Sequence, residues 1–198
     1  MHIREWPGLH DRMIGRVPTV VAYEAGRRRN TSWGFECPMG FMFGSSRAVR
    51  DKFTLYLDPT LLSLVHQVYT EDIFGSLEDV EMWFEDFLRS LYKHIVRYFI
   101  EFFKINDWKS YNVEFVFSVP IIWDSSAVIP SFRAILARAG FGEAEEHTIS
   151  TELTEEEAMA KYASMGVKLQ EGNILLVLDD GERSKVRFPT SSKEKLAG

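Results

Sequence analysis

Hydrophobic residues recur at steps of three and four positions along one long stretch of the chain. The series begins at Val80 and ends at Phe103, and it follows Ser76, which has an acid, Asp79, three positions later. This spacing places apolar side chains on one face of a helix, and a serine followed by such an acid is typical of a capped N-terminus. We therefore predict an amphipathic helix from Ser76 to the region of Asn106, with its aromatic stripe packed in the protein core.

Shorter patterns precede this helix. Residues 17–23 and 31–35 are strand-like, and they enclose a polar turn that contains Gly26. Two such runs around a glycine-containing turn predict a β-hairpin. A short helix is expected between Pro59 and Val68.

The second half of the chain alternates strands with helices. The expected elements are a strand at 112–120, a helix capped by Ser125 or Ser126 and stopped by Gly140 after Ala139, a strand at 145–150, a helix capped by Thr154, and a strand at 173–178. The first of these strands becomes mostly apolar, as in a strand covered on both faces. This alternation predicts an α/β fold with a mixed sheet. Residues 189–198 are polar without periodicity, which predicts a disordered tail after a domain at 1–188.

Composition narrows the class of protein. The 198 residues, 45% of them hydrophobic, suit one domain or two small lobes. The net charge of -6 argues against a nucleic-acid partner, and the basic run Arg27–Arg29 is expected to be a solvated loop. No apolar run is long enough to span a membrane, and Cys37, the single cysteine, cannot form an internal disulfide. We expect a cytoplasmic protein without a membrane partner.

One polar turn follows the strand at 173–178. It contains Asp179, Gly181 and Ser184, an order of acid, glycine and hydroxyl that suggests phosphate binding by backbone amides. Glu182 and Arg183 stand where glycines would let a phosphate approach. At ~4 Å and an effective dielectric near 20, each contact between Glu182 and a phosphate charge costs about 4 kcal/mol. The turn therefore predicts weakened nucleotide binding.

Four segments in this order carry a resemblance to a known family. They are 17–19 (VPT) followed by Trp33-Gly34, 117–123 (FSVPIIW), 154–162 (TEEEAMAKY) and 179–184 (DDGERS). The chain resembles the nucleotide-binding domain of the 70-kDa heat-shock chaperones, and most of all the divergent fungal-type members. The resemblance implies the first lobe of an actin-like ATPase, or ribonuclease H-like, fold over residues 1–188. It also implies a chain truncated at both ends, without the first phosphate loop and without the second lobe.

The same resemblance implies a cofactor and a set of site residues. ATP and Mg²⁺ would bind, with Asp179 near the metal, the amide of Gly181 and the hydroxyl of Ser184 on a phosphate, and Glu155 orienting water. Asp179 and Glu155 are thus the candidate catalytic residues. The alternatives are that Asp179 only starts a polar turn, Ser184 is solvated, and Glu155 favours a helix N-terminus. The histidines and Cys37 show no spacing typical of a protein metal site.

Three hypotheses about function follow from the sequence. The first is a chaperone-like ATP-binding fragment with weak or lost ATP hydrolysis, so whether the chain is an enzyme stays open. The alternative is a non-catalytic interaction module that uses exposed first-lobe surface to bind a protein partner or a second copy of itself. The third is a truncated gene product without a separate role.

Overall fold

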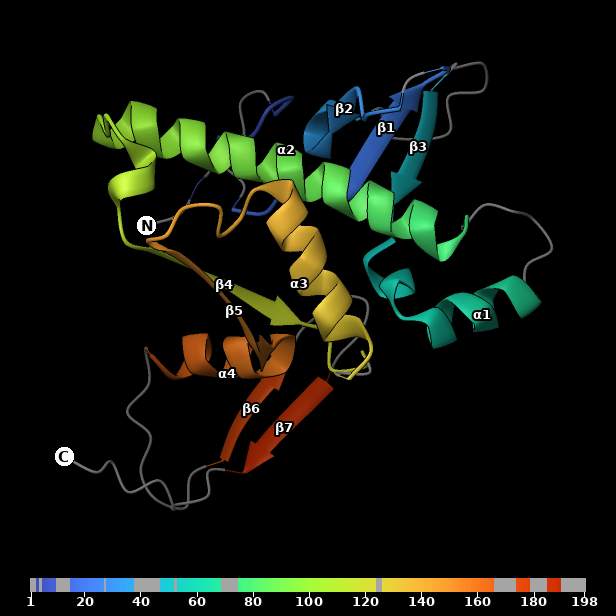
Figure 1. Ribbon diagram of the computed structural model, residues 1–198. Helices are drawn as coiled ribbons and strands as arrows, with labels where there is room; N and C mark the ends of the chain where they lie inside the picture. The colour runs from blue at the N-terminus through green and yellow to red at the C-terminus, as the bar shows by residue number, and fades with distance from the viewer. Residues whose placement is uncertain are drawn as a thin grey trace. The chain divides into compact units, whose positions relative to one another are not determined.

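The computed structural model describes residues 3, 5–9, 15–26, 28–37, 47–51, 53–68, 75–123, 126–165, 174–178 and 185–189. The chain divides into two compact units, one of residues 1–115 and 123–149 and the other of residues 116–122 and 150–198. Both helices and strands are present, which confirms the α/β class (Figure 1). The described strands form three small sheets, of three, two and two strands, in place of the single mixed sheet that the sequence predicts.

The first unit contains the predicted β-hairpin. Strand β1 (Val20–Glu24) pairs antiparallel with β2 (Ser32–Trp33) on one side and with β3 (Arg47–Asp51) on the other. The hairpin prediction is confirmed, whereas β3 was not predicted. Its sequence, RAVRD, carries a charge at both ends, as edge strands often do, and gives little hydrophobic signal.

The long helix α2 (Leu77–Phe103) begins where the sequence predicts. The Ser76 hydroxyl accepts a hydrogen bond from the Asp79 backbone N–H at 3.2 Å, and the Asp79 carboxylate accepts one from the Ser76 N–H at 2.9 Å. This reciprocal pair satisfies backbone donors that have no partner within the helix. The helix ends at Phe103, where Lys104 adopts a left-handed conformation with φ 56°, slightly before the expected end.

Only the first half of α2 is buried in the core. Its buried residues lie between Val80 and Leu88, and Phe84 stacks on Phe132 with ring centroids 5.5 Å apart. The side chains of Phe102 and Phe103 are 62% and 47% exposed, so the prediction of core packing along the whole stripe is wrong. The helix is about 40 Å long, which is more than the shorter α3 packed against it can cover.

Two shorter α-helices are described in this unit, together with the 3-10 turns Gly34–Glu36, Phe53–Leu57 and Trp108–Ser110. Helix α1 (Pro59–Val68) is confirmed, and the Asp58 carboxylate accepts a hydrogen bond from the Thr60 N–H at 2.8 Å near its start. Helix α3 (Val128–Ala139) ends at Gly140, whose φ of 111° is strained for any residue with a Cβ, as the predicted stop requires. Its N-cap is Ala127 without a side-chain hydrogen bond, so a cap at Ser126 is wrong, and Ser125 lies outside the described residues.

Strands β4 (Val113–Val119) and β5 (His147–Thr154) pair with each other in a two-stranded sheet. Side chains of β4 alternate between exposed and half-buried positions, and Glu114, Val116 and Ser118 are exposed. The prediction of a strand covered on both faces is therefore wrong, because only one face of β4 packs against other described residues. The predicted strand at 145–150 corresponds to the first half of β5.

The second unit contains helix α4 (Glu155–Ser164) and the antiparallel pair of β6 (Ile174–Leu178) and β7 (Lys185–Pro189). Thr154 caps α4 as predicted, and its hydroxyl accepts a hydrogen bond from the Glu157 N–H at 3.1 Å. Strand β6 confirms the prediction for residues 173–178, and β7 was not predicted. The tail predicted at 189–198 lies outside the described residues after Pro189.

In the part of the chain that the structure describes, no helix is both long enough and apolar enough to cross a membrane.

Candidate functional site

The residues predicted to bind nucleotide are described only in part. Asp179, Gly181 and Ser184 lie outside the described residues, but Leu178 and Lys185 on either side of them pair across β6 and β7. Glu155 is the first residue of α4 and is exposed. Within the described ranges, no group of His, Cys, Asp or Glu side chains has the arrangement of a metal site.

The surroundings of Glu155 are those of a capped helix start. Thr154 donates two hydrogen bonds to the Glu157 carboxylate, from its N–H at 2.9 Å and from its hydroxyl at 3.2 Å. These bonds lower the pKa of Glu157. With Glu155 and Glu156, this acid places negative charge at the positive end of the helix dipole. This geometry accounts for a helix-stabilising role of Glu155, and its catalytic role stays a prediction.

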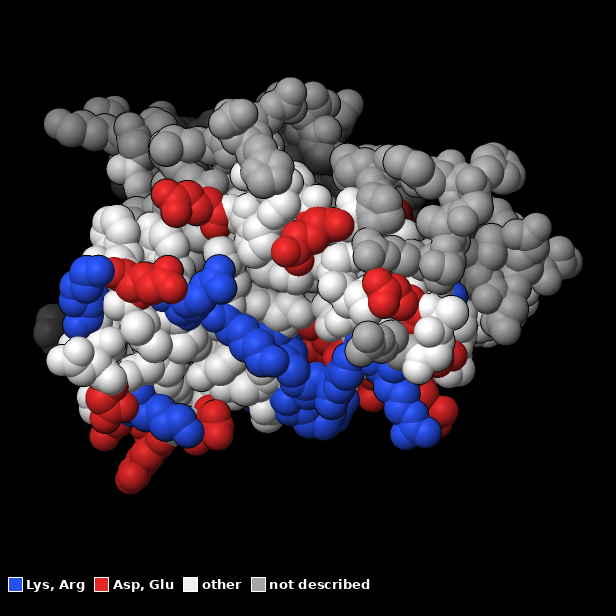
Figure 2. Space-filling view, turned by 90° about the horizontal axis from the view of Figure 1, so that it is seen from above, with Lys and Arg blue, Asp and Glu red and all other residues white. Residues whose placement is uncertain are grey.

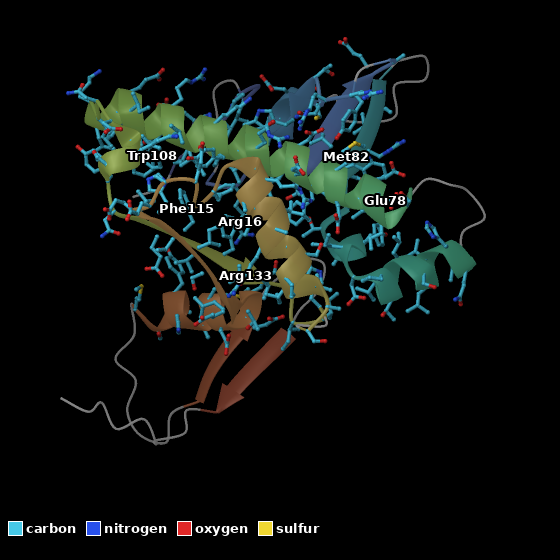
Figure 3. The ribbon with its side chains drawn as sticks, in the orientation of Figure 1. Arg16, Glu78, Met82, Trp108, Phe115 and Arg133 are labelled. Atoms are coloured by element: carbon cyan, nitrogen blue, oxygen red, sulfur yellow. The ribbon has the colours of Figure 1, made fainter. Side chains whose placement is uncertain are left out.

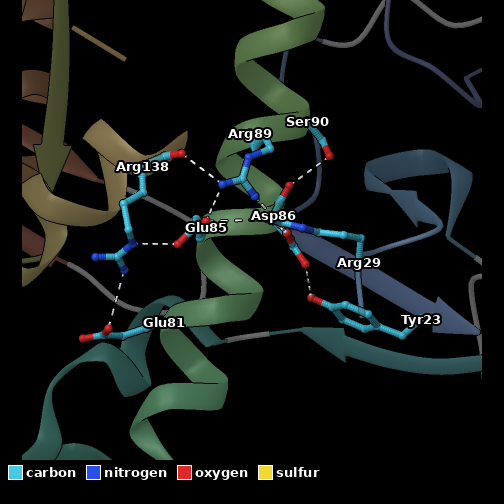
Figure 4. A network of polar contacts seen from close by, with 8 residues as sticks. All are labelled: Tyr23, Arg29, Glu81, Glu85, Asp86, Arg89, Ser90 and Arg138. Atoms are coloured by element: carbon cyan, nitrogen blue, oxygen red, sulfur yellow. Dashed lines mark hydrogen bonds and ion pairs between the residues drawn. The ribbon is translucent and has the colours of Figure 1, made fainter. Parts of the chain in front are cut away.

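A buried carboxylate in the first unit was not among the predicted site residues. The Asp86 side chain on α2 is 1% exposed. It accepts hydrogen bonds from the Tyr23 hydroxyl at 3.0 Å, from Arg29 at 2.9 Å and from Arg89 at 3.2 Å (Figure 4). The two guanidinium groups and the phenol offset part of the cost of burying the charge.

Burial shifts the pKa of both members of the Tyr23–Asp86 pair. Burial raises the pKa of Asp86, although the Tyr23 hydrogen bond and the Arg29 charge partly oppose the shift. Burial also raises the pKa of Tyr23 far above its ordinary value, and the nearby Asp86 charge adds to the effect. Tyr23 is therefore a neutral hydrogen-bond donor, which suits a structural network better than proton transfer near neutral pH.

The network continues from α2 to α3. Glu85 pairs with Arg89, and Arg138 on α3 reaches Glu85 at 2.7 Å and Glu81 at 3.6 Å (Figure 4). Salt bridges and hydrogen bonds thus connect the hairpin, α2 and α3 within one unit. A chain of this kind fixes the positions of elements that are distant in sequence.

One feature of the sequence could have revealed this network. Asp86 stands three positions after Trp83 and directly before Phe87, so it interrupts the buried stripe of α2 with a charge. A charge at such a position needs partners from elsewhere in the fold. The expectation of a solvated basic run is confirmed for Arg28 and Arg29, which are both exposed, and Arg29 in addition pairs with Asp86. Arg27 lies outside the described residues.

An apolar groove lies at the C-terminal end of α2. Its volume is about 680 Å³, and its lining includes Phe103 and Tyr111, which are 47% and 49% exposed. Figure 3 shows Trp108 and Phe115, two further lining residues, at this end of the helix. The other lining residues are Ile95, Phe99, Ile105, Asn112, Val113 and Glu114.

A packed aromatic cluster forms the floor of the groove. Trp108 lies 5.7 Å from Phe99 between ring centroids, and Phe115 lies 5.0 Å from Phe141 in an edge-on arrangement. The buried His147 is bonded through Nε2 to the Trp108 backbone carbonyl at 3.2 Å. Edge-on aromatic packing and this hydrogen bond stabilise the floor. The groove therefore presents an aromatic base to the apolar side chains of a partner.

Comparisons with known proteins give no relative for this chain: no family model matches it, and neither the curated proteins nor the solved structures contain a match.

Proposed function

We propose that this chain is a non-catalytic protein-interaction module, and that the groove at the end of α2 binds an apolar segment of a partner protein. The observation that carries the proposal is the exposure of Phe103 and Tyr111 above a packed aromatic floor. Exposed apolar surface next to a formed cavity is characteristic of contact sites.

The lining of the groove indicates the chemistry of the partner segment. Its volume, about 680 Å³, lies in the range in which a few anchor side chains can be buried. Glu114 is exposed in the lining, and no cation among the described residues forms an ion pair with it. A segment with an aromatic or branched apolar anchor next to a lysine or arginine would complement both features.

A peptide selection tests this proposal. Random peptides displayed on phage are selected against the wild-type chain and counter-selected against Phe103→Ser. Enriched peptides should combine an apolar anchor with a basic residue, and should bind Phe103→Ser at least about tenfold more weakly by fluorescence polarisation. Val68→Ser is the matched control, since Val68 is an exposed apolar residue on α1, outside the groove, at 73% exposure.

The outcomes separate the possible occupants of the groove. Peptides that bind wild type and Phe103→Ser equally would contradict the proposal, as would the absence of any enriched peptide. Dimerisation that Phe103→Ser abolishes, measured by sedimentation, would mean that a second copy fills the groove in place of a partner.

A second candidate function rests on the second unit. We infer that a chaperone-like nucleotide site, within an actin-like ATPase first lobe, is compatible with the antiparallel pairing of Leu178 with Lys185. Residues 179–184 connect these two positions and contain Asp179, Gly181 and Ser184. Short connections between paired strands can present several backbone amides to one phosphate. Asp179 would then lie near Mg²⁺, and Glu155 on α4 belongs to the same unit.

Nucleotide binding has a direct test in thermal unfolding. A ligand that binds only the folded state raises stability by RT ln(1 + [L]/Kd), so millimolar Mg-ATP should raise the unfolding midpoint even at a weak site. The rise should be lost in Asp179→Ala and kept in Asp51→Ala, a matched change at an exposed acid of the first unit. If the unfolding midpoint does not rise even at ATP concentrations above the physiological level, this candidate function is contradicted. The groove proposal would be unaffected.

A further inference from the structure

A second cavity lies between the three-stranded sheet and the first turns of α2. Its volume is about 580 Å³, and its lining includes Tyr23, Arg28, Arg50, Asp79 and Trp83. Met82, which also lines it, is labelled near the start of α2 in Figure 3. We propose that this cavity binds a small organic anion through one phosphate or carboxylate group, independently of the groove at the other end of the helix.

Two arginines supply positive charge among the described residues of the lining. Arg28 comes from the turn of the hairpin and Arg50 from β3. In the described part of the chain, no carboxylate lies within ion-pair distance of either guanidinium, whereas Arg29 and Arg89 are paired with acids on α2. Guanidinium groups present a planar set of donors that matches the oxygens of phosphate and carboxylate.

The position of Arg50 is held by an aromatic ring. Its guanidinium carbon lies 4.9 Å from the centroid of the Trp83 ring, and its Nη1 donates to the Val49 carbonyl at 3.3 Å. Trp83 is buried at 7% exposure, so the ring provides a fixed surface for the cation. An arginine held in this way loses less conformational entropy when an anion binds.

The remaining groups leave the lining with an excess of positive charge. Tyr23 is neutral, and its hydroxyl donates to Asp86, which Arg29 and Arg89 neutralise. Asp79 is the one acid among the described residues of the lining, and its carboxylate accepts hydrogen bonds from the Ser76 N–H and hydroxyl, both at 2.9 Å. The chain as a whole has a net charge of -6, and in the view of Figure 2 a band of Lys and Arg side chains lies next to Asp and Glu side chains.

The size and the walls of the cavity define the ligand further. A volume of about 580 Å³ is typical of small-molecule sites and exceeds what a bare phosphate ion fills. Met82 and Trp83 provide an apolar wall for a carbon skeleton. Asp79 disfavours a second anionic group in the cavity, because like charges repel. The expected ligand therefore has one oxyanion and a neutral organic part.

The experiment uses three probes on the full chain labelled with ¹⁵N: phenyl phosphate, benzoate and inorganic phosphate. Each is titrated while the backbone amide shifts are followed by NMR. Phenyl phosphate or benzoate should shift amides around the cavity and bind more tightly than inorganic phosphate. Arg28→Gln and Arg50→Gln should each weaken that binding at least about tenfold, since a hydrogen bond to a charged group is lost.

Arg97→Gln is the matched control, because Arg97 carries the same charge on α2 but does not line this cavity. If Arg50→Gln fails to fold, Arg28→Gln still tests the proposal, since Arg28 is exposed and no described residue pairs with it.

Tighter binding of phenyl phosphate than of benzoate assigns an organic phosphate as the ligand, and the reverse order assigns a carboxylate. Absence of binding at millimolar concentrations overturns the proposal, as does equal weakening by Arg28→Gln and Arg97→Gln. If inorganic phosphate binds as tightly as phenyl phosphate and benzoate do, the inference that the ligand has an organic part is overturned.

Discussion

The two halves of α2 share one hydrophobic periodicity but have different surroundings. In the first half, Trp83 and Phe87 are 7% and 5% exposed, and both pack in the core. In the second half, Phe102 is 62% exposed, and the groove opens beside Phe103. The comparison shows that periodicity identifies the apolar face of a helix without showing how much of that face another element covers.

The charged residues of the helix differ in the same way. Asp86 in the first half is buried and has three partners, whereas Arg97 and Glu101 in the second half form a pair at 3.9 Å with side chains 68% and 70% exposed. A buried charge requires partners, while an exposed pair competes with water and contributes little. The first half therefore supports the fold, and the second half offers surface for binding.

The largest difference between the halves should come from truncating one phenylalanine in each. Phe87→Ala should lower the free energy of unfolding by about 3–5 kcal/mol, because it leaves a cavity in the core. Phe102→Ala should change it by no more than about 0.5 kcal/mol, because that ring is already 62% exposed. Urea unfolding followed by circular dichroism measures both losses, and equal losses would show that the two halves do not differ in their contribution to stability.

A smaller loss is expected when the charge of the buried network is removed. Asp86→Asn keeps the size of the side chain but replaces one of its two acceptor oxygens with an NH₂ donor, among the donors of Tyr23, Arg29 and Arg89, which should cost about 1–3 kcal/mol. In a double-mutant cycle, Arg29→Gln should cost much less in the Asp86→Asn background than in the wild type. Additive losses would show that the two side chains are not coupled.

The same variant has a pH signature with a definite sign. Because the pKa of Asp86 is raised above its ordinary 3.8, the folded protein binds a proton there more readily than the unfolded chain. The contribution of Asp86 to stability should therefore decline as pH rises from about 3.8 through the raised pKa. Relative to Asp86→Asn, the wild type should lose stability across that window, and a flat difference would contradict the shift.

His94 lies where the buried half of α2 gives way to the exposed half. Its effect on the pH dependence of stability should be smaller than that of Asp86. The ring lies 5.1 Å from Trp6 and 5.9 Å from Trp33 between centroids, and burial lowers its pKa below 6.5. A backbone hydrogen bond at Glu5 and the charges of Glu101 and Glu36 act in the opposite direction, while Arg97 lowers the pKa further.

The folded protein therefore resists protonation of His94, so stability should fall as pH drops through 6.5 toward the lowered pKa. Thermal unfolding at a series of pH values measures this slope. The slope should be reduced in His94→Gln and kept in His66→Gln, a control at an exposed histidine of α1. An unchanged slope in His94→Gln would assign the pH dependence to another group.

The smallest effect is expected for the exposed pair of the second half. Arg97→Gln or Glu101→Gln should change the free energy of unfolding by no more than about 0.5 kcal/mol, and salt should remove even that change. Urea unfolding at low and high salt is the measurement. A loss of unfolding free energy as large as that of Asp86→Asn would mean that exposure does not determine how much a charge pair in this helix contributes to stability.

Elements specified by neighbouring residues could be predicted from the sequence. The start of α2 depends on Ser76 and Asp79, the start of α4 on Thr154 and Glu157, and the end of α3 on Gly140. Each involves groups within one or two helical turns, so the chain encodes it locally. The nucleotide residues Asp179, Gly181 and Ser184 stay a prediction, because they lie outside the described residues.

Tertiary structure decided the features that join distant parts of the chain. Strand β3 has little pattern of its own and exists because it pairs with β1, and Arg29 meets Asp86 only when the hairpin packs on α2. The sequence by itself determined which face of α2 is apolar. Only the folded chain determined that its first half is covered and its second half is open, because burial depends on which elements reach a surface.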